Sequence, residues 1–360
     1  MMATLLRDPH CEKPMSSGLP NLESFVASLP RLTLGQFPTP LVKLGRLGDR
    51  LDLDLWLKRD ECAGLAVGGN KTRKLEFILA DAMAKGHDTI VTAGPVTSNH
   101  TMMTAMAARR VGLTAHCVVG GERPRPLSGN LLLLDYLGAT LHFSPADFRA
   151  PTAEGVHRHQ ALCREVVDET GGYWIPGGGT MPQAEPAYMN AVAEIARQRG
   201  GVFDFDRVVL AIGTGSTTTG VLLGLALGGF DCRVDAVATA NRAAIEEVFK
   251  RPDPTRHFLK SVTHFDLPLG AADVPPYEIV FGFAEEGYSV PSAGGDRAIR
   301  TMAREEGYLL DPVYTAKAFD GLMTMVGDGR IPKGSRVLFL HTGGLSMTSV
   351  SDQQFAPPPV

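Results

Sequence analysis

Short apolar segments rich in β-branched residues alternate with longer helical segments along most of this 360-residue chain. Such segments, expected as strands, are residues 51–58, 89–93, 114–119, 139–143, 173–176, 208–212, 233–238, 278–281 and 337–341. Helical periodicity follows Lys71 and recurs over residues 153–169, 185–199 and 293–306. Strands that alternate with helices form parallel sheets covered by helices on both faces. We therefore expect an α/β fold.

Four glycine- or serine-containing turns follow expected strands, at residues 94–100, 177–180, 213–220 and 342–344. Sheets of this kind bind ligands at the carboxyl ends of their strands. The four turns are therefore expected to surround one ligand site.

The turn from Gly213 to Gly220 holds three glycines and five hydroxyl residues between a strand and a helix. Its backbone amides, hydroxyls and helix N-terminus favour one bound anion. The patterns of a P-loop and of a dinucleotide-binding fingerprint are both missing. A phosphate held without Mg²⁺ suits a phosphorylated cofactor. A tight turn that only packs a helix on a strand is the alternative.

Lys71 follows Gly68 and Gly69 at the point where a loop becomes a helix. Glycines allow tight turns and close approach to a ligand, and a helix N-terminus attracts anions. We interpret Lys71 as a Schiff-base lysine. A helix cap surrounded by solvated Lys and Arg side chains explains this segment equally well when it is taken alone.

Ser98-Asn99-His100 also stands where a strand gives way to a helix. Serine and asparagine are good N-caps, so capping alone could explain them. The functional interpretation is that they bind a substrate carboxylate close to the reacting centre. Tyr314, after Asp311-Pro312, and Tyr288 are either packed tyrosines with satisfied hydroxyls or residues of the same site.

The bulk composition excludes several kinds of partner. A net charge of −4 gives no reason to expect nucleic acid or an anionic membrane surface. No apolar run reaches the roughly 18 residues of a membrane span. The five scattered cysteines lack metal-ligand spacing and indicate reduced thiols, so we expect a cytoplasmic protein without a metal site.

Several motifs together resemble one enzyme family. They are Lys58-Arg59-Asp60, Gly64-Leu65, Gly68-Gly69-Asn70-Lys71-Thr72-Arg73-Lys74-Leu75-Glu76, Ser98-Asn99-His100, Leu310-Asp311-Pro312-Val313-Tyr314 and His341-Thr342-Gly343-Gly344. In this order and spacing they resemble the pyridoxal-phosphate family of D-cysteine desulfhydrase, 1-aminocyclopropane-1-carboxylate deaminase and L-cysteate sulfo-lyase, over about residues 30–345. The resemblance implies the two-domain fold of the tryptophan synthase β chain, called fold type II, and a homodimer.

The resemblance also implies a role for individual residues. Lys71 would carry pyridoxal 5'-phosphate, and Lys74 would lie at its phosphate beside the loop residues Gly213, Thr214, Gly215, Ser216 and Thr217. Asn99 would face the phenolic oxygen, and Thr315 would be the partner of the pyridine nitrogen, where the deaminases have glutamate. Ser98, Tyr314 and, less directly, Tyr288 match catalytic positions. Ser98, Asn99 and His100 would bind the substrate.

The same resemblance divides the chain into two domains. Residues 1–68 and 172–360 would form the large cofactor-binding domain. Residues 69–171 would form the small domain, which carries Lys71 and the substrate-carboxylate loop.

The implied activity is α,β-elimination on a small amino acid, such as cysteine, cysteate or a related compound, to give a keto acid and ammonia. A hydroxyl at the pyridine nitrogen favours elimination of a good leaving group over harder reactions. Ring opening by a 1-aminocyclopropane-1-carboxylate deaminase, and a β-replacement synthase or isomerase of a specialised pathway, are the alternatives. The family pattern changes at Met102-Met103 and at Ser289, which should lie near the substrate.

Overall fold

The computed structural model describes residues 18–66, 68–124, 126–148, 151–243 and 253–344. Its strands are β1 (Leu41–Lys43), β2 (Asp54–Arg59), β3 (Thr89–Pro95), β4 (Thr114–Gly120), β5 (Thr140–Ser144), β6 (Tyr173–Ile175), β7 (Arg207–Ile212), β8 (Arg233–Ala238), β9 (Tyr277–Val280) and β10 (Arg336–His341). Its α-helices are α1 (Leu19–Ser28), α2 (Gly45–Leu51), α3 (Asn70–Ala84), α4 (Asn99–Arg110), α5 (Gly129–Tyr136), α6 (Ala153–Thr170), α7 (Pro186–Gln198), α8 (Ser216–Gly228), α9 (Pro254–Phe265), α10 (Ala293–Glu306) and α11 (Thr315–Gly327).

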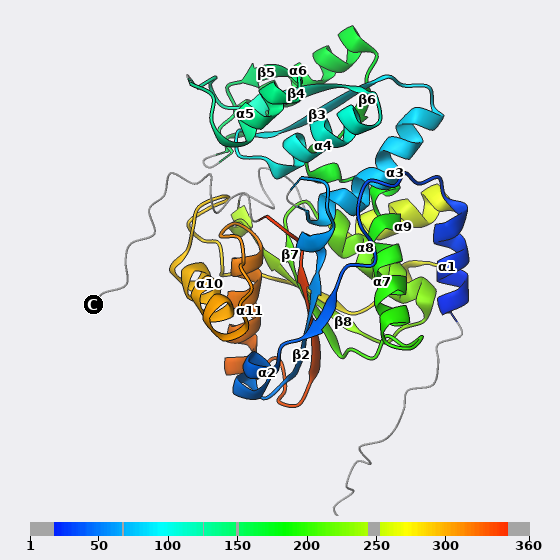
Figure 1. Ribbon diagram of the computed structural model, residues 1–360, viewed down its shortest axis with the longest axis vertical. Coiled ribbons are helices and arrows are strands. Elements are labelled where there is room, and N and C mark those ends of the chain that lie inside the picture. Colours follow the sequence, from blue (N-terminus) through cyan, green and yellow to red (C-terminus); the bar gives the residue numbers. More distant parts are fainter. Residues whose placement is uncertain (1–17, 67, 125, 149–150, 244–252, 345–360) are drawn as a thin grey trace, which may run out of the picture.

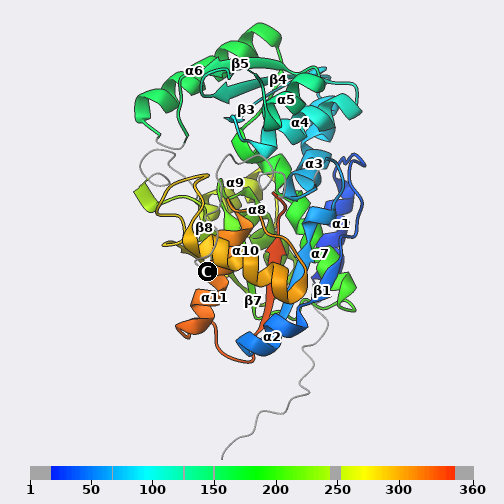
Figure 2. The ribbon, with the colours of Figure 1, turned by 60° about the vertical axis from the view of Figure 1, so that its left-hand side comes forward.

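Two sheets form two lobes, one above the other in the view of Figure 1 and again in Figure 2. The larger sheet has the order β1-β2-β10-β7-β8-β9, and the smaller one has the order β5-β4-β3-β6. All pairings are parallel except that of β1 with β2. The expected α/β fold with parallel-type sheets is confirmed, with β1 as an antiparallel edge strand.

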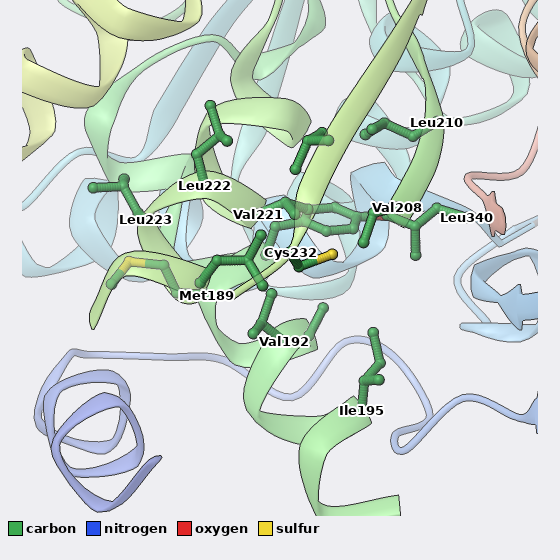
Figure 3. Packing of buried hydrophobic residues seen from close by; sticks show 14 of the residues in the cluster. Met189, Val192, Ile195, Val208, Leu210, Val221, Leu222, Leu223, Cys232 and Leu340 are labelled. Atoms are coloured by element: carbon green, nitrogen blue, oxygen red, sulfur yellow. The ribbon is translucent and has the colours of Figure 1, made fainter. Parts of the chain in front are cut away.

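Helices cover both faces of each sheet. In the larger lobe, one core joins α1, α7, α8 and α9 to the sheet, and a second core joins α2, α10 and α11 to its other face. Figure 3 shows side chains of α7, α8 and β7 gathered in the first of these cores. In the smaller lobe, α3, α4 and α5 share a core on one face of the sheet, and α6 packs on the other face.

Close packing of α8 on α7 explains why α8 contains glycine. A Cβ atom added at Gly224 would lie 2.9 Å from Cβ of Val192, and one added at Gly220 would lie 2.6 Å from the carbonyl oxygen of Glu185. Only glycine therefore lets the two helices approach this closely. The contact fixes the N-terminus of α8, which begins directly after the glycine- and hydroxyl-rich turn.

Some elements differ from the sequence expectation. Helices α1 and α9 are not among the helices expected from the sequence. Pro20 and Pro254 stand in the first turn of these helices, where the missing N–H has no intrahelical partner to lose. The expected strand over 51–58 begins later, at Asp54, because Leu51 ends helix α2.

The sheets also bear on the expected domain boundary. Strand β6 pairs with β3 through Tyr173, Trp174 and Ile175, so the smaller sheet extends past residue 171, where we expected the small domain to end. We propose that the small domain ends after Ile175.

Candidate active site

A cavity of about 260 Å³ lies between the two lobes, at the carboxyl ends of β3, β7 and β10. All four turns singled out in the sequence contribute to its wall. The glycine and hydroxyl residues of the wall include Gly94, Ser98, Gly177, Gly178, Gly213, Thr214, Gly215, Ser216, Thr217, Thr218, Thr342, Gly343 and Gly344. The four turns therefore meet at one cavity, and the binding of a ligand there stays a prediction.

Lys71 stands in the first turn of α3 and lines this cavity. The preceding residue pair makes the turn: Gly69 has φ 106°, and a Cβ atom at Gly68 would lie 1.9 Å from the carbonyl oxygen of Glu61. Nζ of Lys71 donates a hydrogen bond to Oδ1 of Asn70 at 2.9 Å. Burial lowers the pKa of Lys71 to about 8, so a fraction of the amine is uncharged near neutral pH and can act as a nucleophile or base.

The glycine and hydroxyl turn after β7 forms an anion cradle with Lys74. Ser216 Oγ and Thr218 Oγ1 are buried and have no hydrogen-bond partner among the described residues. Lys74 is buried too, and no ion pair or hydrogen bond joins its ammonium to the described chain. Burial, and then the neighbouring Lys71, lowers the pKa of Lys74 well below its usual range. A phosphate at the N-terminus of α8 would satisfy both hydroxyls and favour the charged form of the lysine.

Asn70 joins the lysine helix to the anion cradle. Its Nδ2 donates to Oγ1 of Thr217 at 3.1 Å, while its Oδ1 accepts from Lys71. One side chain therefore holds the first turns of α3 and α8 together. Asn70 belongs to the glycine-lysine motif, but its role at the site was not predicted from the sequence.

The Ser98-Asn99-His100 segment starts α4 and lines the cavity. Ser98 Oγ accepts from the backbone N–H of Thr101 at 3.2 Å, so the capping interpretation is confirmed alongside the cavity position. Asn130 of α5 donates to Oδ1 of Asn99 at 3.0 Å and to the carbonyl of Thr97, and thereby fixes the amide.

His100 is buried within the same wall. Its Nε2 lies 2.9 Å from Oγ1 of Thr92, and burial together with Lys71 and Lys74 lowers the pKa of His100 well below its usual range. The imidazole is therefore neutral and can offer the site a hydrogen bond but no charge. Of the two methionines that depart from the family pattern, Met103 lines the cavity, whereas Met102 is buried in the small-domain core.

Tyr288 and Tyr314 both line the cavity, and their hydroxyl groups face one another. Their hydroxyl oxygens are 2.5 Å apart. Burial raises the pKa of both phenols, that of Tyr314 well above its usual range. Both therefore stay protonated at neutral pH and form a hydrogen-bonded pair that can donate to a group in the cavity. Ser289, the second departure, is buried next to this pair and has φ 63°.

Thr315 does not line the cavity. Its Oγ1 donates to Asp311 Oδ1 at 2.7 Å, and the same carboxylate accepts from the backbone N–H groups of Val313, Tyr314 and Thr315. These bonds hold the turn that presents Tyr314, and the role of Thr315 at the pyridine nitrogen stays a prediction. Threonines that do line the cavity include Thr239 and Thr342, and Thr342 lies between β10 and two glycines.

A buried ion cluster anchors α3 to the large lobe. Arg73 lies between the carboxylates of Asp60 and Glu194, and Nζ of Lys58 donates to Glu194 at 2.5 Å. Arg73 comes two residues after Lys71 and one before Lys74, so the cluster sets the position of both lysines. The sequence did not predict the cluster, because Lys58 lies on β2, Asp60 directly after β2, and Glu194 on α7.

Comparison with known proteins agrees with this geometry. A family model described as "Pyridoxal-phosphate dependent enzyme" matches residues 32–343. A putative 1-aminocyclopropane-1-carboxylate deaminase of Pyrococcus abyssi is 36% identical, over 91% of this chain and 95% of its own. A D-cysteine desulfhydrase of Yersinia enterocolitica is 36% identical, over 90% of this chain and 96% of its own.

A solved structure shows the same fold. The crystal structure of an ACC deaminase homologue superposes with a TM-score of 0.79 at 34% identity, and the match covers 91% of this chain and 96% of that one. The expected architecture of the resembled family, fold type II, is thereby confirmed.

Proposed function

The chain belongs to the family of pyridoxal-phosphate-dependent enzymes, and we propose that it catalyses α,β-elimination on a small amino acid. The substrate carries a leaving group on its β-carbon, as cysteine, cysteate and related compounds do, and the products are a keto acid and ammonia. This is the chemistry of a desulfhydrase-like lyase. One observation carries the choice of elimination over ring opening: no Asp or Glu is among the described residues that line the cavity.

The described residues fit the cofactor. Lys74 and the residues Gly213, Thr214, Gly215, Ser216 and Thr217 would hold its phosphate, and Asn99 would face its phenolic oxygen. Thr315 or Thr342 would offer a hydroxyl to the pyridine nitrogen. When bound, pyridoxal phosphate withdraws electrons from the α-carbon of an amino acid, so that a negative charge there is stabilised. A neutral hydroxyl at the ring nitrogen makes this withdrawal weaker than a carboxylate would, which suits a good leaving group.

Residues of the chain would bind the substrate, remove its proton and assist the leaving group. The N-terminus of α4, with Ser98, Asn99 and His100, would bind the substrate carboxylate through backbone and side-chain donors. Lys71, with its pKa of about 8, would remove the proton from the α-carbon. Tyr314, held by Tyr288 and by the Asp311 turn, would donate a hydrogen bond to the departing group. These roles are proposals that rest on the shared cavity.

Ring opening of 1-aminocyclopropane-1-carboxylate is the second candidate. It is favoured by the similarity to a putative deaminase of that name, at 36% identity. The lack of a carboxylate in the described cavity wall argues against it, because ring opening requires stronger electron withdrawal than elimination of a thiolate. A β-replacement synthase or isomerase requires a second substrate or a reprotonating group, and Met103 and Ser289 alone do not identify either one.

We also propose the setting in which the enzyme acts. The described cysteines Cys62, Cys117, Cys163 and Cys232 are free thiols, as expected in a reducing cytoplasm. None of the described helices is long and apolar enough to cross a membrane. A homodimer is proposed from the family resemblance, and light scattering on the purified holoenzyme tests it.

A panel of amino acids tests the proposed activity. Both enantiomers of cysteine, cysteate and β-chloroalanine, together with 1-aminocyclopropane-1-carboxylate, are incubated with cofactor-loaded protein, and the keto acid, ammonia, sulfide and sulfite are measured. We expect keto acid and ammonia in equal amounts from at least one β-substituted amino acid, and none from the Lys71→Ala variant. Keto acid from the cyclopropane substrate alone would instead establish the second candidate.

A further inference from the structure

The cavity has a second wall that the family motifs do not account for. Helix α6 and its flanks contribute Phe148, Val156, His159, Gln160, Cys163 and Trp174. We call this part of the cavity the α6 lobe. It lies on the small-domain side, beyond the carboxyl end of β3, and Gln160 at its mouth is exposed to solvent. The lobe is therefore room for a part of the substrate that projects from the reacting centre toward solvent.

None of the described side chains of the α6 lobe carries a positive charge at neutral pH. His159 is buried, its Nδ1 lies 2.7 Å from Oγ of Ser144, and its ring packs edge-on against Phe148 at 5.2 Å. Burial lowers the pKa of His159 to about 4, so the ring is neutral. Burial also raises the pKa of Cys163 to about 12, so this residue is a neutral thiol packed beside Val166 and Trp174.

The cationic side chains of the described cavity wall lie outside the α6 lobe. Of the described residues that line the cavity, only Lys71 and Lys74 are lysines and none is an arginine. Both lysines stand at the cofactor end, beside the anion cradle. Arg164 lies close enough to Cys163 to affect its pKa but does not line this cavity. A sulfonate or carboxylate in the α6 lobe would therefore lose its hydration without a cation of the described cavity wall beside it, which is costly. An uncharged apolar or aromatic group would instead bury its surface against Phe148, Val156 and Trp174.

We infer that the α6 lobe selects amino acids with a large uncharged substituent on the β-carbon, such as S-alkyl and S-aryl cysteines. This inference rests on the proposed elimination and specifies its substrate class. In the reaction, the α-carbon loses its proton and the Cβ–S bond breaks, with the electron pair leaving on sulfur as a thiol. Water then supplies the keto oxygen, and the nitrogen leaves as ammonia. S-benzylcysteine plus water thus gives phenylmethanethiol, pyruvate and ammonia.

Steady-state kinetics of the holoenzyme test the inference with three probes in both enantiomeric forms: S-benzylcysteine, cysteine and cysteate. We expect kcat/KM for S-benzylcysteine to exceed that for cysteate by about tenfold or more. Equal or better use of cysteate would overturn the inference. Turnover of cysteine without turnover of S-benzylcysteine would overturn it too, and would leave the proposed elimination intact. No keto acid from any β-substituted amino acid would instead refute the proposed function.

Variants of α6 test whether the selectivity for a large β-substituent depends on residues of the α6 lobe. Val156→Phe narrows the lobe at a half-buried position, so the ratio of kcat/KM for S-benzylcysteine over cysteine should fall about tenfold. Gln160→Trp, at the exposed mouth, should lower the same ratio. His157→Phe is the matched control, because His157 is exposed on the same helix and does not line the cavity. A ratio that responds equally in all three variants, or in none, would contradict the assignment.

Discussion

Replacing Arg73 by methionine should destabilise the protein more than any surface change of the same kind. The guanidinium of Arg73 makes five hydrogen bonds of 2.8 to 2.9 Å, to Asp60, Glu194 and Thr39. All of these side chains are buried. Methionine fills a similar volume but leaves two buried carboxylates with Lys58 as their nearest cation. Removing one partner from a buried ion pair costs about 3–5 kcal/mol.

The assay is urea unfolding of the cofactor-free protein, because bound cofactor adds its own stabilisation. Arg158→Met is the matched control: Arg158 pairs with Glu154 on the exposed face of α6, and such pairs contribute about 0.5 kcal/mol or less. A free energy of unfolding for Arg73→Met within about 1 kcal/mol of that for Arg158→Met would refute the claim that this cluster anchors α3.

The same cluster predicts a pH dependence of stability. Burial alone would raise the pKa of Asp60 and of Glu194, but the Arg73 guanidinium holds both below their usual range. A carboxyl group whose folded pKa is lowered stabilises the folded state above its unfolded pKa of about 4 and loses that contribution as the pH falls through the folded value. Stability of the wild type should therefore drop below about pH 4. In Arg73→Met the drop should begin at higher pH, and coincident profiles would contradict this electrostatic account.

Three further predictions concern other parts of the molecule. In an equilibrium titration, Lys74→Met should weaken pyridoxal phosphate binding about tenfold or more, while pyridoxal, which has no phosphate, binds almost as before. An equal loss of affinity for both ligands would exclude a contact between Lys74 and the phosphate. Gly224→Val should lower the free energy of unfolding by about 1–3 kcal/mol, because α8 packs tightly on α7. Gly327→Ala should be close to neutral, because a Cβ atom added there meets no atom within 4 Å. Equal losses of stability in the two variants would contradict the packing argument. Tyr314→Phe removes the hydroxyl that lies 2.5 Å from Tyr288 and should lower kcat about 10²-fold with little change in KM; an unchanged kcat would remove Tyr314 from the reaction.

The parts of the fold that the sequence predicted are those in which local pattern and tertiary structure agree. The buried strands β7 and β10 each hold an unbroken apolar run, residues 208–212 and 337–340, and a glycine-containing turn follows each strand. Both the strand and the candidate ligand site at its end could therefore be predicted. Helices α1 and α9 were not predicted, because a proline in the sequence is compatible with both the first turn of a helix and a break in one. In α9 the cap distinguishes the two cases, because Asp253 Oδ1 accepts from the N–H of Arg256, whereas α1 has no side-chain cap.

Some residues of the candidate site could be predicted from the sequence, and others could not. Lys71, Ser98 and the loop after β7 were predicted because each lies at the end of an element, and short motifs encode such positions. The contacts of Thr315 could not be predicted, because neighbouring positions of one turn can face opposite sides: Tyr314 reaches the cavity, and the next residue bonds back to Asp311. The α6 lobe was not predicted at all. Four of its side chains occur in an ordinary amphipathic helix, and Phe148 and Trp174 lie outside that helix. Only the tertiary packing of α6 against the smaller sheet brings these residues together at the cavity.

The most direct test of the central claim is keto acid release from β-chloroalanine compared with 1-aminocyclopropane-1-carboxylate, in the wild type and in Lys71→Ala. The account predicts pyruvate and ammonia from one or both enantiomers of β-chloroalanine, little or no product from the cyclopropane substrate, and loss of the activity in the variant. Ring opening without elimination, or elimination that persists in Lys71→Ala loaded with pyridoxal phosphate, would contradict it.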